Sequence, residues 1–406
     1  MKPGYKQSEV GVIPEEWECA KLSEFFSFIS YGFTNPMPSV HDGVFMITAA
    51  DINNGRLQLD TARKTSETAY RTLLTAKSKP LKNDILLTKD GTLGRLALVG
   101  NETVCINQSV AVIRPNGRVE PQFLKLLLES PRYQKRMVED AGGSTIKHIY
   151  ITIVDKMPLG LPLDISEQRA IVAALSDVDG LLGGLDRLIV KKRDLKHAAM
   201  QQLLTGQTRL PGFHGEWEVK RLGDAFTITA GKSKSAYIVE GGDFWICDMG
   251  SVSIEGRLIV SKRTNYRGDF LKRGDLIMPK DDIGGGNIIG KVGYVDANES
   301  YILGDHVYCL RALEGDPRFL AYVINSHRVN SELRKKVIGS AQLGLGRKSV
   351  NEQEMVFPSV SEQTAIAEVL TEMDAELAAL EQRREKTRAV KQAMMQELLT
   401  GRTRLI

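Results

Sequence analysis

Two segments of the chain carry apolar residues at steps of three and four, the spacing that keeps one face of a helix apolar. The apolar positions are Ile171, Leu175, Val178, Leu182 and Leu185 in the first segment, and Ile366, Leu370, Met373, Leu377 and Leu380 in the second. Each pattern extends over nearly forty residues, which at 1.5 Å per residue is on the order of 60 Å. Because that is too long for one small core, the pattern favours two helices packed along each other as an intramolecular coiled coil.

The two helical segments are copies of one sequence. The first begins Ser166-Glu167-Gln168 and the second Ser361-Glu362-Gln363. Both end in Leu-Leu-Thr-Gly, one residue that differs between the copies, and Thr-Arg-Leu. Both ends give the same offset, since 361 minus 166 and 404 minus 209 are each 195, and roughly half of the aligned positions are identical without a gap. The chain therefore contains an internal duplication.

The ends of the repeat carry helix signals. Ser166 and Ser361 are expected to be N-caps, with the Glu and Gln that follow them in the first turn. Gly206 and Gly401 are expected to stop the helices. The first helix also contains three glycines, each about 1 kcal/mol less favourable than alanine, so a local bend or a close helix approach is expected there: Gly180, Gly183 and Gly184.

The segments before and between the helices are predicted to form short strands, turns and short helices. Apolar runs at 43–47 and 244–247, and at 81–87 and 271–278, predict strands, and both of the later runs lead into a Lys-Asp pair, Lys89-Asp90 and Lys280-Asp281. Pro121 and Pro317 open short helices that extend to Ser130 and Ser326. The predicted fold class is α/β (α+β): two globular mixed modules joined by two long antiparallel helices, with a pseudo-two-fold internal repeat.

Composition changes this interpretation little. A chain of 406 residues that is 42% hydrophobic and 26% charged is typical of a soluble globular protein, and its net charge of +4 permits a local basic surface for a polyanion. The four cysteines stand singly, which argues against a zinc site and for a reducing compartment. Without a signal peptide or a long apolar run, we expect a cytoplasmic protein.

The chain lacks the motifs of common enzymes. Gly231-Lys232-Ser233 has Phe226 where a phosphate loop needs its first glycine, and the six histidines form no HExxH pair. There is no GxSxG elbow, and Asp281-Asp282 is better explained as a solvated turn than as metal ligands. We expect no bond chemistry, no metal and no cofactor on this chain.

Two unlike modules, opened by Ile13-Pro14-Glu15-Glu16-Trp17 and by Gly215-Glu216-Trp217 and each followed by a SEQ-to-LLTG helix, resemble the specificity subunit of type I DNA restriction-modification systems. The resemblance implies a first target recognition domain at 1–160, a central long helix at 161–211, a second domain at 212–357 and a C-terminal helix at 358–406. It also implies two methyltransferase subunits and, through them, restriction (motor-nuclease) subunits as partners. S-adenosylmethionine, ATP and Mg²⁺ would be bound by those partners.

The resemblance directs attention to side chains that can contact double-stranded DNA. Phosphate contacts need Lys or Arg, and base edges need amide or guanidinium groups. We expect Lys89 to match Lys280 in position, and Lys147 to match Arg347 and Lys348. The full set of candidates lies after strands or in polar loops of both modules: Tyr31, Thr34, Asn35, Lys89, Arg95, Lys147, His148, Lys232, Lys234, Lys280, Asn287, Lys291, Arg347 and Lys348. Asp90 and Asp281 are expected to orient the neighbouring lysines or to cap a turn. Because the modules share little sequence, the two half-sites are expected to differ.

The repeated helices are expected to dock the methyltransferase subunits. The positions chosen to mark them are Gln168, Ile171, Leu175, Leu182, Gln363, Ile366, Leu370 and Leu377. The basic run from Arg187 to Lys196 faces DNA phosphates, a partner or solvent. Two other functions stay open from the sequence: a coiled-coil adaptor that joins proteins without DNA, and a self-sufficient methyltransferase or nuclease.

Overall fold

The computed structural model of the protein describes residues 3–139, 141–142, 147–282, 285–339 and 343–405. The chain divides into a first unit, residues 1–186 with 383–406, and a second unit, residues 187–382. Each unit thus contains one part of both long helices, α5 (Ile165–Leu203) and α10 (Val360–Leu398), each of 39 residues. No helix among the described residues is long and apolar enough to cross a membrane.

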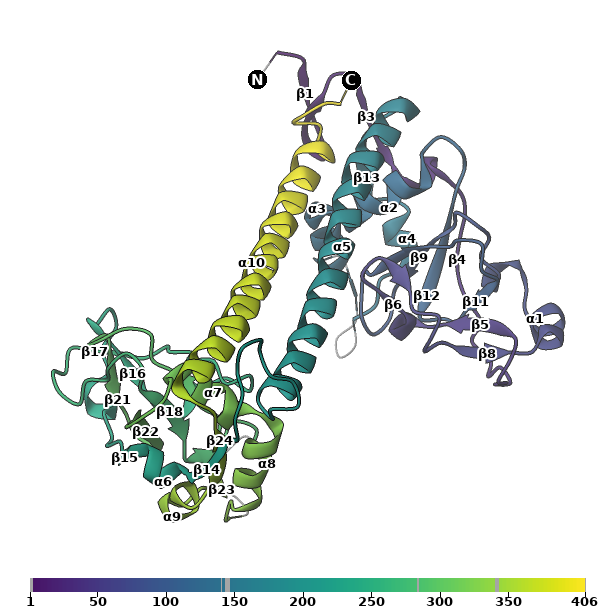
Figure 1. Ribbon diagram of the computed structural model, residues 1–406. Helices are drawn as coiled ribbons and strands as arrows, with labels where there is room; N and C mark the ends of the chain where they lie inside the picture. The colour runs from purple at the N-terminus through teal and green to yellow at the C-terminus, as the bar shows by residue number, and fades with distance from the viewer. Residues whose placement is uncertain (1–2, 140, 143–146, 283–284, 340–342, 406) are drawn as a thin grey trace. The chain divides into compact units, whose positions relative to one another are not determined.

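The first unit consists of short strands and short helices around its part of the helix pair (Figure 1). Its remaining elements are β1 (Tyr5–Ser8), β2 (Gly11–Pro14), β3 (Trp17–Lys21), β4 (Phe26–Tyr31), β5 (Val44–Ile47), β6 (Ile52–Asn53), β7 (Arg56–Leu57), β8 (Arg63–Thr65), α1 (Glu67–Leu73), β9 (Ile85–Thr88), β10 (Leu96–Leu98), β11 (Val104–Ile106), β12 (Val110–Pro115), α2 (Pro121–Glu129), α3 (Pro131–Glu139), α4 (Ile151–Val154) and β13 (Pro158–Pro162).

The second unit has a similar order of elements, without a counterpart of α1 among its described residues. They are β14 (Glu218–Arg221), α6 (Leu222–Ala225), β15 (Phe226–Ala230), β16 (Phe244–Cys247), β17 (Arg263–Thr264), β18 (Leu276–Pro279), β19 (Asp281–Asp282), β20 (Gly293–Tyr294), β21 (Tyr301–Leu303), β22 (Val307–Ala312), α7 (Pro317–Asn325), α8 (His327–Lys335), β23 (Leu343–Gly344), α9 (Arg347–Asn351) and β24 (Glu354–Phe357). The predicted strands and short helices are therefore confirmed, except that Asp281-Asp282 forms a strand paired with β23 and not a solvated turn.

Each unit has a four-stranded and a three-stranded sheet. In the first unit the orders are β10-β9-β12-β4 and β11-β5-β8, and in the second β15-β22-β18-β20 and β17-β16-β21. The β5–β11 and β16–β21 pairs are parallel, and the other pairs within these sheets are antiparallel. The predicted mixed α/β class is confirmed.

The central strands separate two cores in each unit. Side chains of a strand alternate between its faces, so Ile85 and Leu87 of β9 pack with α2 and the long helices, whereas Leu86 packs against the three-stranded sheet. In the second unit Leu276 and Ile277 of β18 divide in the same way. Because both faces are covered, these strands are uninterrupted apolar runs.

The two ends of the duplicated sequence meet within each unit. In the first unit Ile171 and Leu175, near the start of α5, share a core with Leu398 and Leu399, at the end of α10. The Arg404 guanidinium binds the Glu167 carboxylate, whose side chain is 1% exposed. The start of the first helix copy therefore packs against, and forms an ion pair with, the end of the second copy.

The second unit makes the reciprocal contact. Arg209 donates to both Glu362 oxygens at 2.5 and 2.6 Å, and the Trp217 indole N–H donates to the same carboxylate at 3.3 Å. Leu203 and Leu204 pack with Ile366. The Glu of each copy thus pairs with the Arg of the other copy.

The glutamine of each repeat start fixes the chain around it. The Gln168 amide donates to Pro162 O at 2.8 Å and accepts from Glu120 N at 2.7 Å. Gln363 does the same with Pro358 O and Asp316 N, both at 2.9 Å. Both glutamines are buried, so they join the start of each long helix to the short helix of its own domain.

The N-cap prediction for the two serines is wrong by two positions. Helix α5 begins at Ile165 and the Asp164 carboxylate accepts the Ser166 N–H at 2.8 Å. Helix α10 begins at Val360 and the Ser359 hydroxyl accepts the Glu362 N–H at 3.4 Å. An earlier side chain accepts in both cases, so each predicted cap is already inside its helix. The predicted stops are confirmed, since Gly206 and Gly401 follow the helix ends with φ of +72° and +71°.

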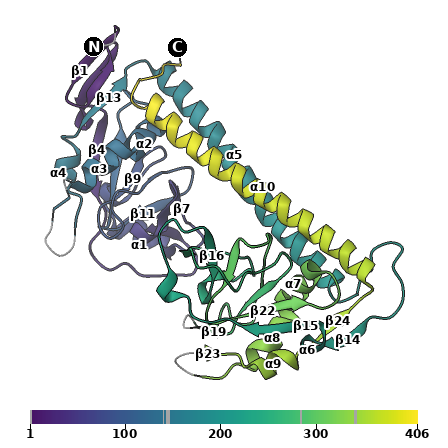
Figure 2. The same ribbon diagram turned by 90° about the vertical axis from the view of Figure 1, so that its left-hand side faces the viewer.

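Helices α5 and α10 lie side by side and antiparallel in each unit (Figures 1 and 2). In the first unit Asp179 pairs with Lys391 at 2.6 Å and Asp186 with Arg384 at 3.5 Å. In the second, acids of α10 pair with bases of α5: Lys192 with Glu376 at 2.6 Å, Arg193 with Glu381 at 2.5 Å and Lys196 with Asp374 at 2.6 Å. The predicted pairing of the two helices is confirmed.

The charge pattern of the helices favours the antiparallel direction. Residues 165–186 hold four acidic and one basic residue and 360–382 hold six acidic and none basic, whereas 187–203 hold five basic and one acidic and 383–398 five basic and two acidic. Antiparallel pairing brings each acidic part against a basic part. A parallel pair would place like charges together, which is unfavourable.

Helix α5 continues through its glycines without a break. A Cβ added at Gly180 or at Gly184 would meet no atom within 4 Å. We therefore expect Gly180→Ala and Gly184→Ala each to stabilise the protein by up to about 1 kcal/mol, measured by urea unfolding. The control is Gly206→Ala, which is expected to destabilise because its φ is +72°. A loss of stability in the first two variants would contradict the prediction.

Candidate nucleic-acid interface

The central strand of the first unit, β9, ends at a backbone junction of three segments. The Lys89 N–H donates to Ser109 O at 2.9 Å, and Lys89 O accepts the Ile149 N–H at 2.9 Å. Ser109 directly precedes β12, and Ile149 directly precedes the segment that leads into α4. Lys89 is thus held between two segments from distant parts of the domain.

The central strand of the second unit, β18, ends in the same way. The Lys280 N–H donates to His306 O at 3.0 Å, and Lys280 O accepts the Leu345 N–H at 2.7 Å. Lys89 and Lys280 therefore occupy equivalent positions, as the sequence predicted. The same bonds make His306 the counterpart of Ser109, and Leu345 the counterpart of Ile149.

An ionic cluster surrounds Lys89. The Asp90 carboxylate accepts from Lys89 Nζ at 2.7 Å and from His148 Nδ1 at 2.6 Å. Burial opposes ionisation of Asp90, but the hydrogen bonds from Lys89 and His148 outweigh it and lower the pKa of this carboxyl. The His148 side chain is 40% exposed, so its ring remains accessible to a ligand.

The second unit has a similar cluster of a lysine, an aspartate and a histidine. The Asp281 carboxylate lies 3.5 Å from Lys280 Nζ and 2.7 Å from His306 Nδ1. The His306 side chain is 44% exposed, and its Nε2 lies 3.7 Å from an Asp305 oxygen. The expectation that the two aspartates orient the lysines fits this geometry.

The histidines of the two clusters do not occupy equivalent positions. His148 lies on the segment before α4, whereas His306 lies on the turn before β22. In each cluster Nδ1 is the ring nitrogen that contacts the carboxylate, so Nε2 is the second polar edge of the ring. The imidazole therefore comes from a different segment in each unit. In both units it lies beside a lysine ammonium at the end of a central strand.

An exposed aromatic ring lies beside the first cluster. The Tyr31 ring, at the end of β4, has Lys89 Nζ at 5.5 Å and Lys77 Nζ at 5.9 Å from its centroid. Thr34 and Asn35 follow it and are exposed. Aromatic and amide groups beside lysines are suited to sugars, bases and phosphates.

We expect Asp90→Asn to lower the free energy of unfolding at pH 7 by about 0.5–1 kcal/mol, because it weakens two charge-assisted hydrogen bonds at a partly solvated site. The sign of the pH dependence follows from the lowered pKa of Asp90. Stability from a carboxyl with a lowered pKa is present above its unfolded pKa, about 3.9, and is lost as the pH falls through its folded pKa. The difference between wild type and variant should therefore persist from pH 7 to 5 and shrink in stronger acid, as measured by urea unfolding at each pH.

The remaining predicted residues of the first unit are dispersed. Lys147 is exposed, and the half-buried Arg95 donates from its guanidinium to Ile52 O at 3.2 Å. Lys147 precedes Ile149 by two residues, whereas Arg347 follows the equivalent Leu345 by two. The expected match of Lys147 with Arg347 and Lys348 is therefore wrong, because the shared backbone bonds place them on opposite sides of the junction.

In the second unit one predicted DNA contact is contradicted. The Lys234 side chain is 5% exposed, its ammonium pairs with Asp269 at 2.8 Å and it lies 5.0 Å from the Tyr266 ring centroid. This ammonium is already satisfied inside the domain and is not available to DNA. By contrast, the other predicted residues are exposed or half-buried: Lys232, Asn287, Lys291, Arg347 and Lys348.

Seven of the eight positions chosen to mark docking helices are buried within this chain, and Leu182 is half-buried. The buried positions are Gln168, Ile171, Leu175, Gln363, Ile366, Leu370 and Leu377. Their side chains lie inside the two units, so a partner that docks on these helices has to contact other residues. Docking itself stays a prediction.

Sequence reasoning missed two members of the clusters, His306 and Lys77. His306 directly precedes a buried strand, which is a local signal, but its Asp281 partner is 25 residues away. Lys77 stands in a short 3-10 helix, Ala76–Ser78, without any motif. Among the described residues no group of three or more His, Cys, Asp or Glu side chains is placed to hold a metal ion.

A sequence profile of the family described as Type I restriction modification DNA specificity domain matches residues 14–186 and again 214–388. The chain is 24% identical to the MjaVIII type I restriction enzyme specificity subunit of Methanocaldococcus jannaschii, over 97% of this chain and 94% of that protein. Each profile match covers one module and the first part of the long helix that follows it.

Solved structures share the fold. The S subunit of a type I restriction-modification system from M. genitalium aligns with a TM-score of 0.63 at 17% identity, covering 98% of this chain and 99% of that chain. A chain from a structural study of assembly and conformational transition of the type I R-M system aligns with a TM-score of 0.60 at 17% identity, covering 96% and 99%. The predicted resemblance is confirmed.

Proposed function

This chain belongs to the type I restriction modification DNA specificity family, and we propose that each of its two units reads one half of a bipartite, asymmetric DNA target. In this proposal the chain is a non-catalytic subunit of a DNA adenine methyltransferase and restriction complex. The observation that carries it is the Lys-Asp-His cluster at the end of β9 and again at the end of β18.

The clusters support two reading sites with different specificities. Each presents an ammonium for a phosphate or a guanine edge, and an imidazole edge that accepts or donates according to its protonation. Their surroundings differ, since Tyr31 accompanies only the first cluster and Asp305 only the second. The two clusters occupy equivalent strand ends but have different neighbouring residues. They therefore favour a DNA target whose two halves differ in sequence.

The helices support two identical partners. Several exposed positions are identical in the two copies: Lys191 and Lys386, Arg193 and Arg388, Ala198 and Ala393, and Gln201 and Gln396. Each unit thus presents one copy of the same helix surface. We propose that these surfaces dock two methyltransferase subunits, which bring S-adenosylmethionine and recruit motor-nuclease subunits that use ATP and Mg²⁺.

Methylome sequencing of cells with and without this protein tests the proposal. The expected result is the loss of one bipartite adenine methylation motif whose two halves differ. Purified chain alone should transfer no labelled methyl group, and adding the methyltransferase subunit should restore transfer. Unchanged methylation in cells, with no duplex binding even when the methyltransferase is present, would instead favour a protein adaptor.

A further inference from the structure

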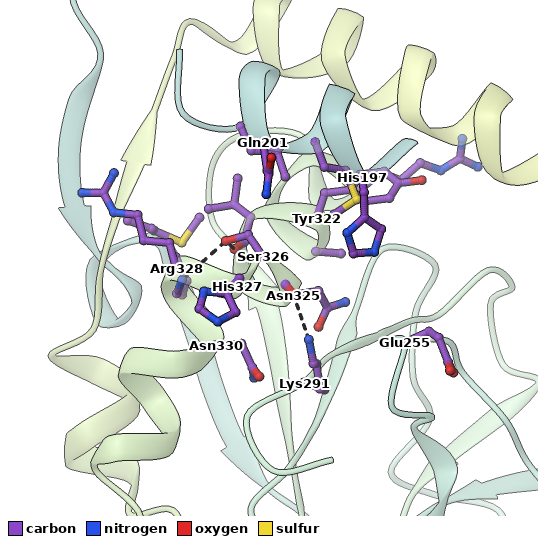
Figure 3. Close-up of a pocket in the computed structure, with 18 of the residues that line it drawn as sticks. His197, Gln201, Glu255, Lys291, Tyr322, Asn325, Ser326, His327, Arg328 and Asn330 are labelled. Carbon is purple, nitrogen blue, oxygen red and sulfur yellow. Dashed lines mark hydrogen bonds between the residues drawn. The ribbon is translucent and has the colours of Figure 1, made fainter. Parts of the chain in front are cut away.

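The second unit contains a large open hollow outside the Lys280–Asp281–His306 cluster. Its volume is about 2040 Å³, and its walls come from α5, from the loop that ends at Lys291 and from the turn between α7 and α8. Figure 3 shows His197 and Gln201 of α5 facing Lys291, Asn325 and His327 across it. Small-molecule sites usually measure about 300–1,000 Å³, so this hollow fits part of a macromolecule.

The lining of the hollow carries an excess of positive charge. Eight Lys and Arg residues line it against five Asp and Glu residues. Some of the cations are neutralised within the chain, such as Lys196 by Asp374 at 2.6 Å and Lys335 by Glu332 at 2.8 Å. Among the described residues, the lining cations without a carboxylate partner lie on α7, on α8 and at the end of the segment before β20: Arg318, Arg328, Arg334 and Lys291.

Arg328 and Arg334 are two of the lining cations for which the described part of the chain holds no carboxylate partner. Both side chains are exposed, and in the described part of the chain no Asp or Glu oxygen lies within 4 Å of either guanidinium. Lys291 lines the same hollow, and its ammonium donates to Asn325 O at 2.9 Å. Burial, together with the positive charge of Arg334, lowers the pKa of Lys291. These cations repel one another, so an anion bound among them would be stabilised.

One segment of the chain connects the hollow to the candidate DNA site. One loop carries Lys280 at its start and Lys291 at its end, and its return is fixed by the Gly290 N–H bonded to Pro279 O at 3.2 Å. The Asn330 amide of α8 donates to Ile289 O at 3.4 Å and holds the same loop against α8. A polyanion that contacts Lys280 therefore has a cationic surface next to it.

We propose that this hollow binds the sugar–phosphate backbone of duplex DNA beside the base pairs that the second unit reads. Arg328, Arg334 and Lys291 contact phosphates, supply affinity without sequence preference and fix the orientation of the duplex on the domain. The inference rests on the proposed function, because it needs a chain that binds DNA.

The test is the salt dependence of duplex binding by the full-length chain. The double variant Arg328→Gln/Arg334→Gln removes two phosphate contacts, and the slope of log K against log salt should become less steep by about 1.8. Its affinity at about 0.15 M salt should fall about tenfold, by the same factor for target and for unrelated duplex. Each single variant should show about half of the change in slope. The control is Arg273→Gln, an exposed residue at the opposite end of β18 from Lys280, which should leave the slope unchanged.

The outcomes separate the two proposals. If wild-type chain binds no duplex at low salt, with or without the methyltransferase subunit, the proposed function fails. If wild type binds and the double variant, folded by circular dichroism, keeps the wild-type slope, the hollow does not hold phosphates. A variant that keeps the slope but no longer binds the methyltransferase subunit would also overturn the inference and assign the hollow to an acidic segment of a protein.

Discussion

Replacing Arg114 by methionine is expected to lower the free energy of unfolding of the first unit by about 3 kcal/mol, because it leaves a buried carboxylate uncompensated. The Arg114 guanidinium binds Asp84 through two nitrogens, at 2.9 and 2.7 Å, and the Asp84 side chain is 2% exposed. Hydrogen bonding to Asp84 raises the pKa of Arg114. Without the arginine, this carboxylate keeps the Leu81 N–H at 2.7 Å, which does not neutralise its charge.

Urea unfolding combined with hydrogen exchange measures this effect. Peptides from β9 and β12 should lose protection. The control is Arg71→Met, which removes an exposed pair with Glu67, 78% and 61% exposed, and should change stability by less than about 0.5 kcal/mol. Equal stability of Arg114→Met and wild type would show that the ion pair contributes no more than an apolar contact.

The second unit has the same ion pair at the equivalent place. Arg311 binds Asp275 at 2.7 and 2.6 Å, and the Asp275 side chain is 2% exposed. Its arginine is 45% exposed, so a smaller loss is expected for Arg311→Met than for Arg114→Met. Each aspartate also accepts a backbone N–H three residues earlier, which explains why an aspartate ends the turn into each central strand.

Lys89→Met and Lys280→Met are expected to weaken binding to the cognate duplex by about 1–3 kcal/mol each, roughly 5- to 150-fold. The reason is that each removes the ammonium held by Asp90 or Asp281 at one reading site. Each variant should relax only one half of the bipartite motif. Methylome sequencing and competition binding with half-site variants of the duplex measure this.

Matched controls are available at the other ends of the same strands. Lys82 and Lys272 are exposed and precede β9 and β18 at equivalent turns. Lys82→Met and Lys272→Met should leave both half-sites unchanged. If Lys89→Met altered both halves of the motif equally, the assignment of one half-site to each unit would be wrong.

The sequence predicted the elements whose signals are local. Apolar residues at helical spacing gave α5 and α10, and apolar runs bounded by turns gave β5, β9, β16 and β18. The duplication identified equivalent positions, so Lys89 and Lys280 were matched correctly. Lys234 was placed wrongly because a loop lysine and a buried one look alike until the aspartate that neutralises it, Asp269, is brought beside it.

The sequence by itself determined that there are two copies of one long helix, two mixed modules and a Lys-Asp pair after each central strand, because these depend on residues near one another in the chain. Only the tertiary structure decided that the copies exchange their ends, with Arg404 binding Glu167 from 237 residues away. It also decided that the histidine beside Asp281 is His306. Contacts of this kind depend on which apolar faces pack together, and periodicity along the chain specifies those faces without specifying their partners.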